Sequence, residues 1–358
     1  MTLVQRHCVL FAVTVMTVVS GCSKSGHGGG IPSKEKRAIV STIAGDGTGA
    51  FADGPALSAR FHSPIDVAVA TDGTIFVADY GNHRIREISG GQVFTLAGSD
   101  SSGFADGVGI AVRFEHPYRL AADAYGSCYV LDEVDPRIRR VAFSGYTITY
   151  AGTATPGYFN GDASDAQFAI NAAGLASDGT GNIYIGDTFN GRIRMIDLAR
   201  QVTTTAGDGK EGLKNGTREA AEFRFPGAVA CDRQGNIYVA DQANFCIRKI
   251  TTAGVVSTFA GSGVRGTADG DAATAQFFDL IDLVVDSQGN IYLIDDQRIR
   301  KVTPAGVVKT ITGGTRGYAD GDGAAAKFKD PGGLGIDAQD NIYVADINNH
   351  RIRKISFQ

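Results

Sequence analysis

A short polar run that could support acid–base chemistry occurs twice in this sequence. Residues 75–88 read IFVADYGNHRIREI, and residues 342–355 read IYVADINNHRIRKI. Each copy sets an aspartate, a histidine and an arginine directly behind a hydrophobic stretch, and such side chains can transfer protons or hold a charged substrate. Their role depends on how many copies the chain contains, because a feature shared by every unit of a repeat is usually one that folding requires.

The polar run belongs to a unit that recurs six times between residue 39 and the end of the chain. An Ala-Gly pair, or Thr-Gly in the last unit, returns in steps of 52 to 55 residues, at 44–45, 97–98, 151–152, 206–207, 260–261 and 312–313. An aspartate closes a hydrophobic run in each unit, at Asp79, Asp132, Asp187, Asp241, Asp295 and Asp346. Self-similarity at a fixed period of this size predicts a repeat architecture.

Each unit has the pattern of four short strands. In the fourth unit, apolar runs at 227–231, 236–240, 246–250 and 255–259 are separated by turn and loop residues. Four consecutive strands form an antiparallel meander, and six such sheets predict an all-β, six-bladed propeller. Because the pattern begins with a fourth strand, residues 39–44 are expected to complete the last blade, which closes the ring and removes an exposed edge.

The runs GNIYVADQANFCIRKI, DNIYVADINNHRIRKI and FVADYGNHRIREI resemble NHL repeats. The resemblance covers residues 39–358 and implies the propeller fold, in a bacterial variety with a long connection of the form AGxGxxGxxDGxxxxAxF between blades. It does not imply one activity, because this fold is used by RNA binders, protein binders, sensor domains and a few enzymes.

The repeated charged residues are predicted to be structural. The aspartate that ends each second strand and the arginine that begins the third flank the same short loop, so a charge-assisted pair between them would fix the hairpin. The predicted pairs are Asp79–Arg84, Asp132–Arg137, Asp187–Arg192 and Asp346–Arg351. Asp-Gly pairs in the long connections, such as those at Asp53 and Asp269, are expected to open helical turns ahead of a core phenylalanine, and a calcium site there is the alternative.

Candidate functional residues are those that differ between equivalent positions, because the fold does not require them. One position of the first strand, which lines the channel of a propeller, carries Asp66, Arg119, Gly174, Ala228, Asp282 and Gly333 in the six units. His62, His116 and Asp279 stand just upstream of this position. One hypothesis is a polar pocket, in which hydrogen bonds are accepted by Asp66, Asp279 and Asp282 and donated by Arg119 and His116. The other is that Asp66 and Arg119 pair with each other and close a water-filled channel.

These residues favour binding over catalysis. No serine or cysteine nucleophile stands beside a histidine in the aligned repeats, and few histidines are available to hold a metal. No cofactor is therefore predicted. If the chain were a metal-dependent lyase or a lactonase-like hydrolase, Asp66 and Asp282 are the positions at which a divalent metal would bind.

Charge and cysteine usage limit the partners. The chain has 34 Lys and Arg against 38 Asp and Glu, a formal net charge of −4, which does not suit a nucleic-acid-binding surface. Cys128, Cys231 and Cys246 lie in the repeats without the spacing of metal ligands and are expected to be unpaired thiols.

The N-terminal residues are typical of an exported lipoprotein. Residues 1–21 combine a positive charge, an apolar run and small residues, which is the arrangement of a secretory signal peptide. The ending VSGC resembles a bacterial lipobox, which implies cleavage before Cys22 and lipid on that residue. Residues 22–38 then form a Gly/Ser/Lys-rich tether to the propeller at 39–358. The expected location is the bacterial cell envelope, outside the cytoplasm.

These features together predict a lipid-anchored, monomeric propeller that binds a surface protein or a glycan through the loop-rich face at the mouth of its channel. The alternative is the metal-dependent lyase or hydrolase, which would use the acidic residues of the same mouth.

Overall fold

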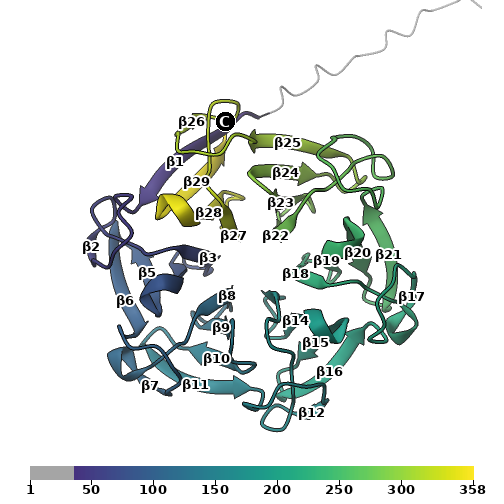
Figure 1. The fold of residues 1–358 in the computed structure, drawn as a ribbon, viewed down its shortest axis with the longest axis horizontal. Helices are drawn as coiled ribbons and strands as arrows, with labels where there is room; N and C mark the ends of the chain where they lie inside the picture. Colours follow the sequence, from purple (N-terminus) through teal and green to yellow (C-terminus); the bar gives the residue numbers. More distant parts are fainter. Residues whose placement is uncertain (1–35) are drawn as a thin grey trace, which may run out of the picture. The chain divides into compact units, whose positions relative to one another are not determined.

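In the computed structural model, which describes residues 36–358, the repeats form a closed ring of six blades around a central channel (Figure 1). The six-bladed propeller predicted from the repeats is thereby confirmed. The expected signal peptide, Cys22 and all of the tether before residue 36 lie outside the described residues. Within the described part, no helix has the length and apolar character needed to cross a membrane.

The first three blades follow one another along the chain, and the strands of each are named in order from the channel outwards. Blade 1 contains β3 (Pro64–Val69), β4 (Ile75–Asp79), β5 (Arg84–Ser89), β6 (Gln92–Gly98) and the short β2 (Gly54–Pro55). Blade 2 contains β8 (Pro117–Ala122), β9 (Cys128–Asp132), β10 (Ile138–Val141), β11 (Tyr146–Ala151) and β7 (Gly107–Val108). Blade 3 contains β13 (Gly174–Ser177), β14 (Ile183–Asp187), β15 (Arg192–Ile196), β16 (Gln201–Ala206) and β12 (Gly161–Asp162).

The other three blades complete the ring. Blade 4 contains β18 (Pro226–Cys231), β19 (Ile237–Asp241), β20 (Cys246–Ile250), β21 (Val255–Ala260) and β17 (Gly216–Thr217). Blade 5 contains β22 (Leu280–Val285), β23 (Ile291–Asp295), β24 (Arg298–Val302) and β25 (Val308–Gly313). Blade 6 contains β27 (Pro331–Ile336), β28 (Ile342–Asp346), β29 (Arg351–Phe357), β1 (Ala38–Ala44) and β26 (Gly321–Asp322).

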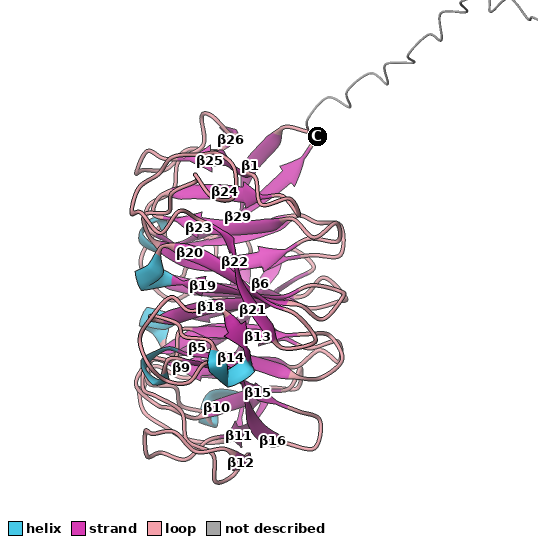
Figure 2. Cartoon of the chain, turned by 90° about the vertical axis from the view of Figure 1, so that its right-hand side faces the viewer, coloured by secondary structure: helices cyan, strands magenta, loops and turns pink. Residues whose placement is uncertain are grey.

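Short 3₁₀ segments occur in the connections between strands. Four of them join the second and third strands of a blade: η1 (Tyr80–Asn82), η3 (Thr188–Asn190), η5 (Gln242–Asn244) and η6 (Ile347–Asn349). Two more lie in the long connections between blades: η2 (Gly109–Ala111) and η4 (Arg218–Ala220). Seen from the side, most of them lie along one face of the ring, the loop-rich face (Figure 2).

The ring is closed by the N-terminal strand, as the sequence predicts. β1 pairs antiparallel with β29, with Val40 opposite Ile355, so that strands from the two ends of the chain share blade 6. Val40 is only 1% exposed and belongs to the core between blades 5 and 6. Pairing with β1 leaves β29 without an open edge toward solvent.

The core lies between neighbouring blades, and one phenylalanine plugs each interface. All six are at most 1% exposed: Phe61, Phe114, Phe168, Phe223, Phe277 and Phe328. Each follows a small, alanine-containing stretch in the long connection, so the prediction that this connection ends in a core phenylalanine is confirmed.

The repeated aspartates form buried ion pairs, but with a different arginine from the one predicted. Asp79 stands opposite Arg84 in the strand register, yet its Oδ2 pairs with the Nη1 of Arg86 at 2.6 Å, and both side chains are fully buried. Equivalent pairs occur in four other blades: Asp187–Arg194, Asp241–Arg248, Asp295–Arg300 and Asp346–Arg353. The predicted pairs Asp79–Arg84, Asp187–Arg192 and Asp346–Arg351 are therefore wrong.

The first arginine of each third strand has another role. Arg84 donates to the carbonyl of Asn82 at 2.7 Å and lies over the ring of Phe51 in the adjoining long connection. Arg192 and Arg351 make the corresponding contacts with Tyr158 and Tyr318. Residues two apart on a strand share a face, and only the second reaches the buried aspartate.

Blade 2 departs from this pattern. Asp132 accepts hydrogen bonds from the backbone amides of Glu115 and His116, and Arg137 pairs with Asp135, so the predicted Asp132–Arg137 pair is also wrong. The aspartate still ties the start of the first strand to the end of the second, which is the function that it has in every blade.

The Asp-Gly aspartates do not open helical turns. Asp53 accepts from the Nη2 of Arg86 at 2.5 Å and from the backbone amide of Thr95 at 3.1 Å, so it joins the third and fourth strands of blade 1. Asp269 contacts Arg300 and Thr310 in the same way.

The three cysteines of the repeats are unpaired, as predicted. Cys128 and Cys246 are buried, and Cys231 is half-buried.

Candidate functional site

A β-bulge near the start of the first strand turns the candidate residues into the channel. The strand register shifts between Pro64 and Asp66 in β3, between Pro117 and Arg119 in β8, and between Leu280 and Asp282 in β22. The extra residue of a bulge re-aims the side chain beside it. Asp66, Arg119 and Asp282 consequently all line one channel cavity of about 160 Å³.

Arg119 spans the channel and closes it toward the loop-rich face. Its Nε donates to the carbonyl of Ala173 at 3.1 Å, Nη1 to that of Gly332 at 2.9 Å, and Nη2 to that of Ile281 at 3.1 Å. These acceptors belong to blades 3, 6 and 5, so one guanidinium from blade 2 joins three other blades. The side chain is only 3% exposed and separates the channel cavity from a second pocket at the mouth.

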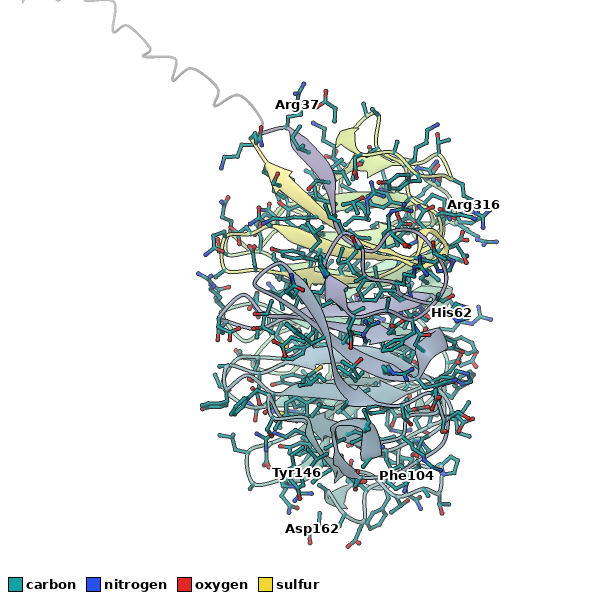
Figure 3. All side chains as sticks on the ribbon, turned by 90° about the vertical axis from the view of Figure 1, so that its left-hand side faces the viewer. Arg37, His62, Phe104, Tyr146, Asp162 and Arg316 are labelled. Atoms are coloured by element: carbon teal, nitrogen blue, oxygen red, sulfur yellow. The ribbon has the colours of Figure 1, made fainter. Side chains whose placement is uncertain are left out.

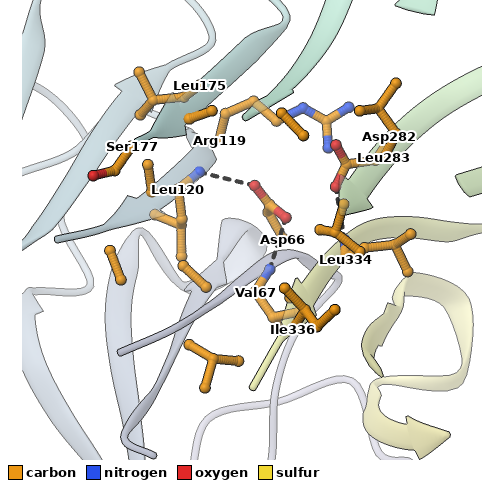
Figure 4. A pocket seen from close by; sticks show the side chains of 18 of the residues that line it. Asp66, Val67, Arg119, Leu120, Leu175, Ser177, Asp282, Leu283, Leu334 and Ile336 are labelled. Atoms are coloured by element: carbon orange, nitrogen blue, oxygen red, sulfur yellow. Dashed lines mark hydrogen bonds between the residues drawn. The ribbon is translucent and has the colours of Figure 1, made fainter. Parts of the chain in front are cut away.

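Asp66 and Asp282 join neighbouring blades through backbone amides (Figure 4). Asp66 accepts from the amide of Val67 and, at 2.8 Å, from that of Leu120 in blade 2. Asp282 accepts from the amide of Leu334 in blade 6 at 2.7 Å. The channel is thus closed, as one of the two hypotheses held, but through carbonyls and amides instead of a direct Asp66–Arg119 bond.

The electrostatics of this cluster follow from burial of two acids beside one base. Burial and the neighbouring carboxylate of Asp282 raise the pKa of Asp66 well above its usual range, and Arg119 offsets only part of this effect. Burial also raises the pKa of Asp282. Burial alone would lower the pKa of Arg119, but Tyr118 and the two aspartates raise it, so the guanidinium stays charged.

The small residues of the ring leave space for groups of the neighbouring blades. A Cβ at Gly333 would lie 1.9 Å from the Oδ1 of Asp66, and one at Gly174 would lie 2.3 Å from the carbonyl of Gly227 in the next blade. These positions therefore permit the close approach of first strands that the charged residues then bridge.

The mouth pocket lies above Arg119 on the loop-rich face and measures about 270 Å³. Its apolar lining includes Ile65, Ile281 and Ile347, its aromatic ring is Tyr118, and its polar lining includes Asp279, Asp296, Gln297 and Asp330. It opens beside blade 5, whose second and third strands are joined by only two residues, Asp296 and Gln297, where blade 6 has η6. The shorter connection leaves a notch in the rim of the face.

The polar groups of the mouth pocket differ in how they are held. Asp330 accepts from Arg316, Gln297 and Asn348, and the hydrogen bond from Arg316 leads in lowering its pKa to about 2, so it is a fixed anion. The Asp279 carboxylate has no hydrogen-bond partner among the described residues, and burial followed by the charge of Asp295 raises its pKa. Asp279 is only partly desolvated by the residues around it, and as a whole it is exposed and available to a ligand.

The two candidate histidines do not reach the mouth pocket. His116 stacks on Tyr80 with ring centroids 4.6 Å apart, and its Nδ1 is buried without a hydrogen-bond partner. The ring of His62 lies 6.1 Å from that of His350 at the junction of blades 6 and 1. In the side view, His62 and Arg316 project from the same face (Figure 3).

The structure therefore divides the predicted site in two. Asp66, Arg119 and Asp282 form the closed channel, Asp279 joins Arg119 at the mouth pocket, and His62 and His116 stand apart. The prediction missed Tyr118, Asp296 and Gln297. The signal for the last two was the shortened loop of the fifth unit, DDQR against DINNHR in the sixth.

The positions considered for a metal are occupied by other contacts. The carboxylates of Asp66 and Asp282 accept hydrogen bonds from backbone amides, as described above. Across residues 36–358, no three His, Cys, Asp or Glu side chains are grouped so that they could hold a metal ion.

Comparison with known proteins agrees with the repeat assignment. The family model described as NHL repeat matches residues 61–88 and 328–355. The chain is 26% identical over 273 residues to Protein SUPPRESSOR OF QUENCHING 1, chloroplastic, of Arabidopsis thaliana, covering 71% of this chain and 26% of that protein. It is 25% identical over 327 residues to NHL repeat-containing protein 2 of Bos taurus, covering 79% of this chain and 45% of that protein. The chain thus spans less than half of these relatives.

Solved structures share the fold at lower identity. A protein of unknown function from Bacteroides thetaiotaomicron aligns with a TM-score of 0.69 and 21% identity, over 90% of this chain and 77% of that one. An auxiliary nutrient binding protein from the same organism aligns with a TM-score of 0.66 and 18% identity, over the same shares of 90% and 77%. A streptogramin B lyase aligns with a TM-score of 0.57 and 12% identity, over 90% and 98%. The protein is a six-bladed β-propeller in which residues 61–88 and 328–355 match the NHL repeat.

Proposed function

We propose that this propeller is a binding module that takes the end of a glycan in its mouth pocket. The observation that carries the proposal is the lining of that pocket, which combines carboxylates, an amide, one aromatic ring and isoleucine side chains. Carboxylates accept hydrogen bonds from sugar hydroxyls, and an aromatic ring covers the apolar face of a sugar. A volume of about 270 Å³ lies just below the usual range for small-molecule sites, which suits one terminal sugar residue.

The contacts within the pocket distribute the roles. Asp330 is preorganised by Arg316 and Asn348, so it accepts hydroxyl donors without first having to be ordered. Asp279 keeps both oxygens available, and the ring of Tyr118 lines the same pocket. The auxiliary nutrient binding protein with the same fold supports the proposal that this chain also captures a ligand.

A second candidate is a surface protein bound on the same face. It is favoured by Phe189 of η3, which is 63% exposed and packs edge-on against Phe225 of the next blade. An exposed aromatic side chain on a polar rim is typical of a protein interface. The two candidates separate experimentally, because Phe189→Ala should affect only the protein partner.

Export and lipid attachment at Cys22 would place this face outside the cytoplasm, where glycans and surface proteins occur. The lipobox-like VSGC carries this part of the proposal. In a bacterial host, the wild-type protein should partition with membranes and Cys22→Ala should not. Equal partitioning of both would contradict anchoring through Cys22.

The test of glycan binding is a glycan array followed by titration calorimetry of each hit. Wild-type protein should bind a hit that Asp279→Asn binds about tenfold or more weakly, since a charged hydrogen-bond acceptor is lost. Asp165→Asn, at an exposed aspartate of blade 3, is the matched control and should bind normally. If no glycan binds, or if Asp279→Asn binds as well as the wild type, the proposal is wrong.

A further inference from the structure

The end of the strands opposite to the mouth carries a repeated corner of three residues. The second strand has a tyrosine at one position in five blades: Tyr129, Tyr184, Tyr238, Tyr292 and Tyr343. The residue paired with it on the third strand is basic in four blades: Arg140, Lys249, Lys301 and Lys354. An aspartate begins the preceding turn in five blades: Asp123, Asp178, Asp232, Asp286 and Asp337.

In three blades this corner holds a lysine over an aromatic ring. The Nζ atoms of Lys249, Lys301 and Lys354 lie 5.3, 5.6 and 5.3 Å from the ring centroids of their paired tyrosines. Lys354 is also 3.8 Å from the carboxylate of Asp337. An ammonium group above a ring and beside a carboxylate is a favourable arrangement because both partners attract the cation.

Blade 1 replaces all three residues of the corner. Phe76 stands in place of the tyrosine, Ala70 in place of the aspartate, and Glu87, paired with Phe76, in place of the basic residue. The ring remains, but the cation of the other blades has become an anion. The smaller alanine and the missing long basic side chain leave the corner unfilled.

A cavity of about 540 Å³ occupies this corner, between the turns of blades 1 and 2. Phe76, Glu87 and Asp72 line it from blade 1, and Tyr125 and Phe143, which are 73% and 76% exposed, line it from blade 2. Among the described residues that line it, none is basic. Burial and then the charge of Asp72 raise the pKa of Glu87, which is the direction expected of a carboxylate without a cation beside it.

We propose that this cavity binds a lysine side chain of a partner protein. The ammonium would lie beside Glu87, at the position that the lysines of blades 4 to 6 occupy, and the aliphatic stem would contact the exposed rings of Tyr125 and Phe143. Charge complementarity commits the site to a cation, and the two exposed aromatic side chains suit a protein surface around it. This site is separate from the mouth pocket and does not depend on the glycan proposal.

The test is an NMR titration of the purified protein with Nα-acetyl-lysine methylamide. Chemical shifts of Phe76, Tyr125 and Phe143 should respond, and the Nε-acetylated compound should bind about tenfold or more weakly because it has lost the charge. Glu87→Lys should abolish binding, because it puts the cation of the other blades into the cavity. Glu87→Gln should weaken it, and Asp279→Asn at the mouth should leave it unchanged.

A charge-matched control and a stability measurement keep the result interpretable. Asp165→Lys makes the same charge change at an exposed site in blade 3 and should bind the lysine probe normally. Glu87→Lys should unfold at the wild-type temperature or above, since Lys249 occupies the equivalent place over Tyr238. Failure of the probe to bind at about 10 mM, equal binding of the acetylated compound, or equal loss in Asp165→Lys would each overturn the proposal.

Discussion

Arg119 is the side chain on which the closure of the channel depends. Its three carbonyl acceptors lie on three different blades, and it is the cation that faces the two buried acids of the channel. Arg119→Met should therefore lower the free energy of unfolding by about 3–5 kcal/mol, the usual effect of removing one partner from a buried charged network. Arg316→Met, on the exposed surface, should cause a much smaller loss in the same urea denaturation experiment.

Asp66 should give the protein a measurable pH dependence. Its pKa is raised in the folded state by burial and by Asp282, so above about pH 4 the folded chain holds a proton that the unfolded chain has lost. The free energy of unfolding should therefore fall as pH rises from about 4 toward the raised pKa. Asp66→Asn should lack this part of the slope. If both proteins showed the same slope, Asp66 would be titrating normally.

The roles of single residues could be predicted from the sequence only in part. That Asp66, Arg119 and Asp282 enter the channel follows from their place on the first strand. That Arg119 reaches carbonyls in three blades does not, because those acceptors belong to segments far from it in the chain. The prediction of an Asp79–Arg84 pair was wrong. The two residues do lie opposite each other in the strand register, but the side chain that reaches the aspartate is that of Arg86.

The interface between two blades depends on its phenylalanine plug. Phe277 is fully buried among residues of blades 4 and 5, whereas its neighbour Phe278 is 38% exposed. Phe277→Ala should destabilise the protein by about 3–5 kcal/mol because it leaves a cavity in the core. Phe278→Ala, which loses only a contact with Arg265, should cost far less. Equal losses in thermal unfolding would mean that the plug does not carry the interface.

The boundaries of the strands could be predicted from the repeated sequence, but the notch at blade 5 could not. Strands and ring closure could be predicted because six aligned copies show what each unit requires. A loop shortened to two residues is visible in the sequence, yet its effect depends on Tyr118 from blade 2 and Asp330 from blade 6. The mouth pocket therefore emerges only when the blades are assembled.

Closure of the ring depends on β1, the first strand of the described chain, because it pairs with β29, the last strand. A protein that begins at residue 46 lacks β1 and should expose the edge of β29, so it should unfold at lower temperature and associate with itself. A protein that begins at residue 36 keeps β1 and should remain monomeric. Light scattering and thermal unfolding compare the two. The same melting temperature and mass for both would be incompatible with closure by β1.

The proposed function of the whole molecule is to bind a ligand in the mouth pocket above Arg119. The decisive experiment is a crystal structure of the protein with a glycan identified on the array. We expect sugar density in contact with Tyr118, within hydrogen-bond distance of Asp279 and Asp330, and Arg119 unmoved across the channel. Sugar density in the channel beyond Arg119, or in the cavity between blades 1 and 2, would refute the proposal.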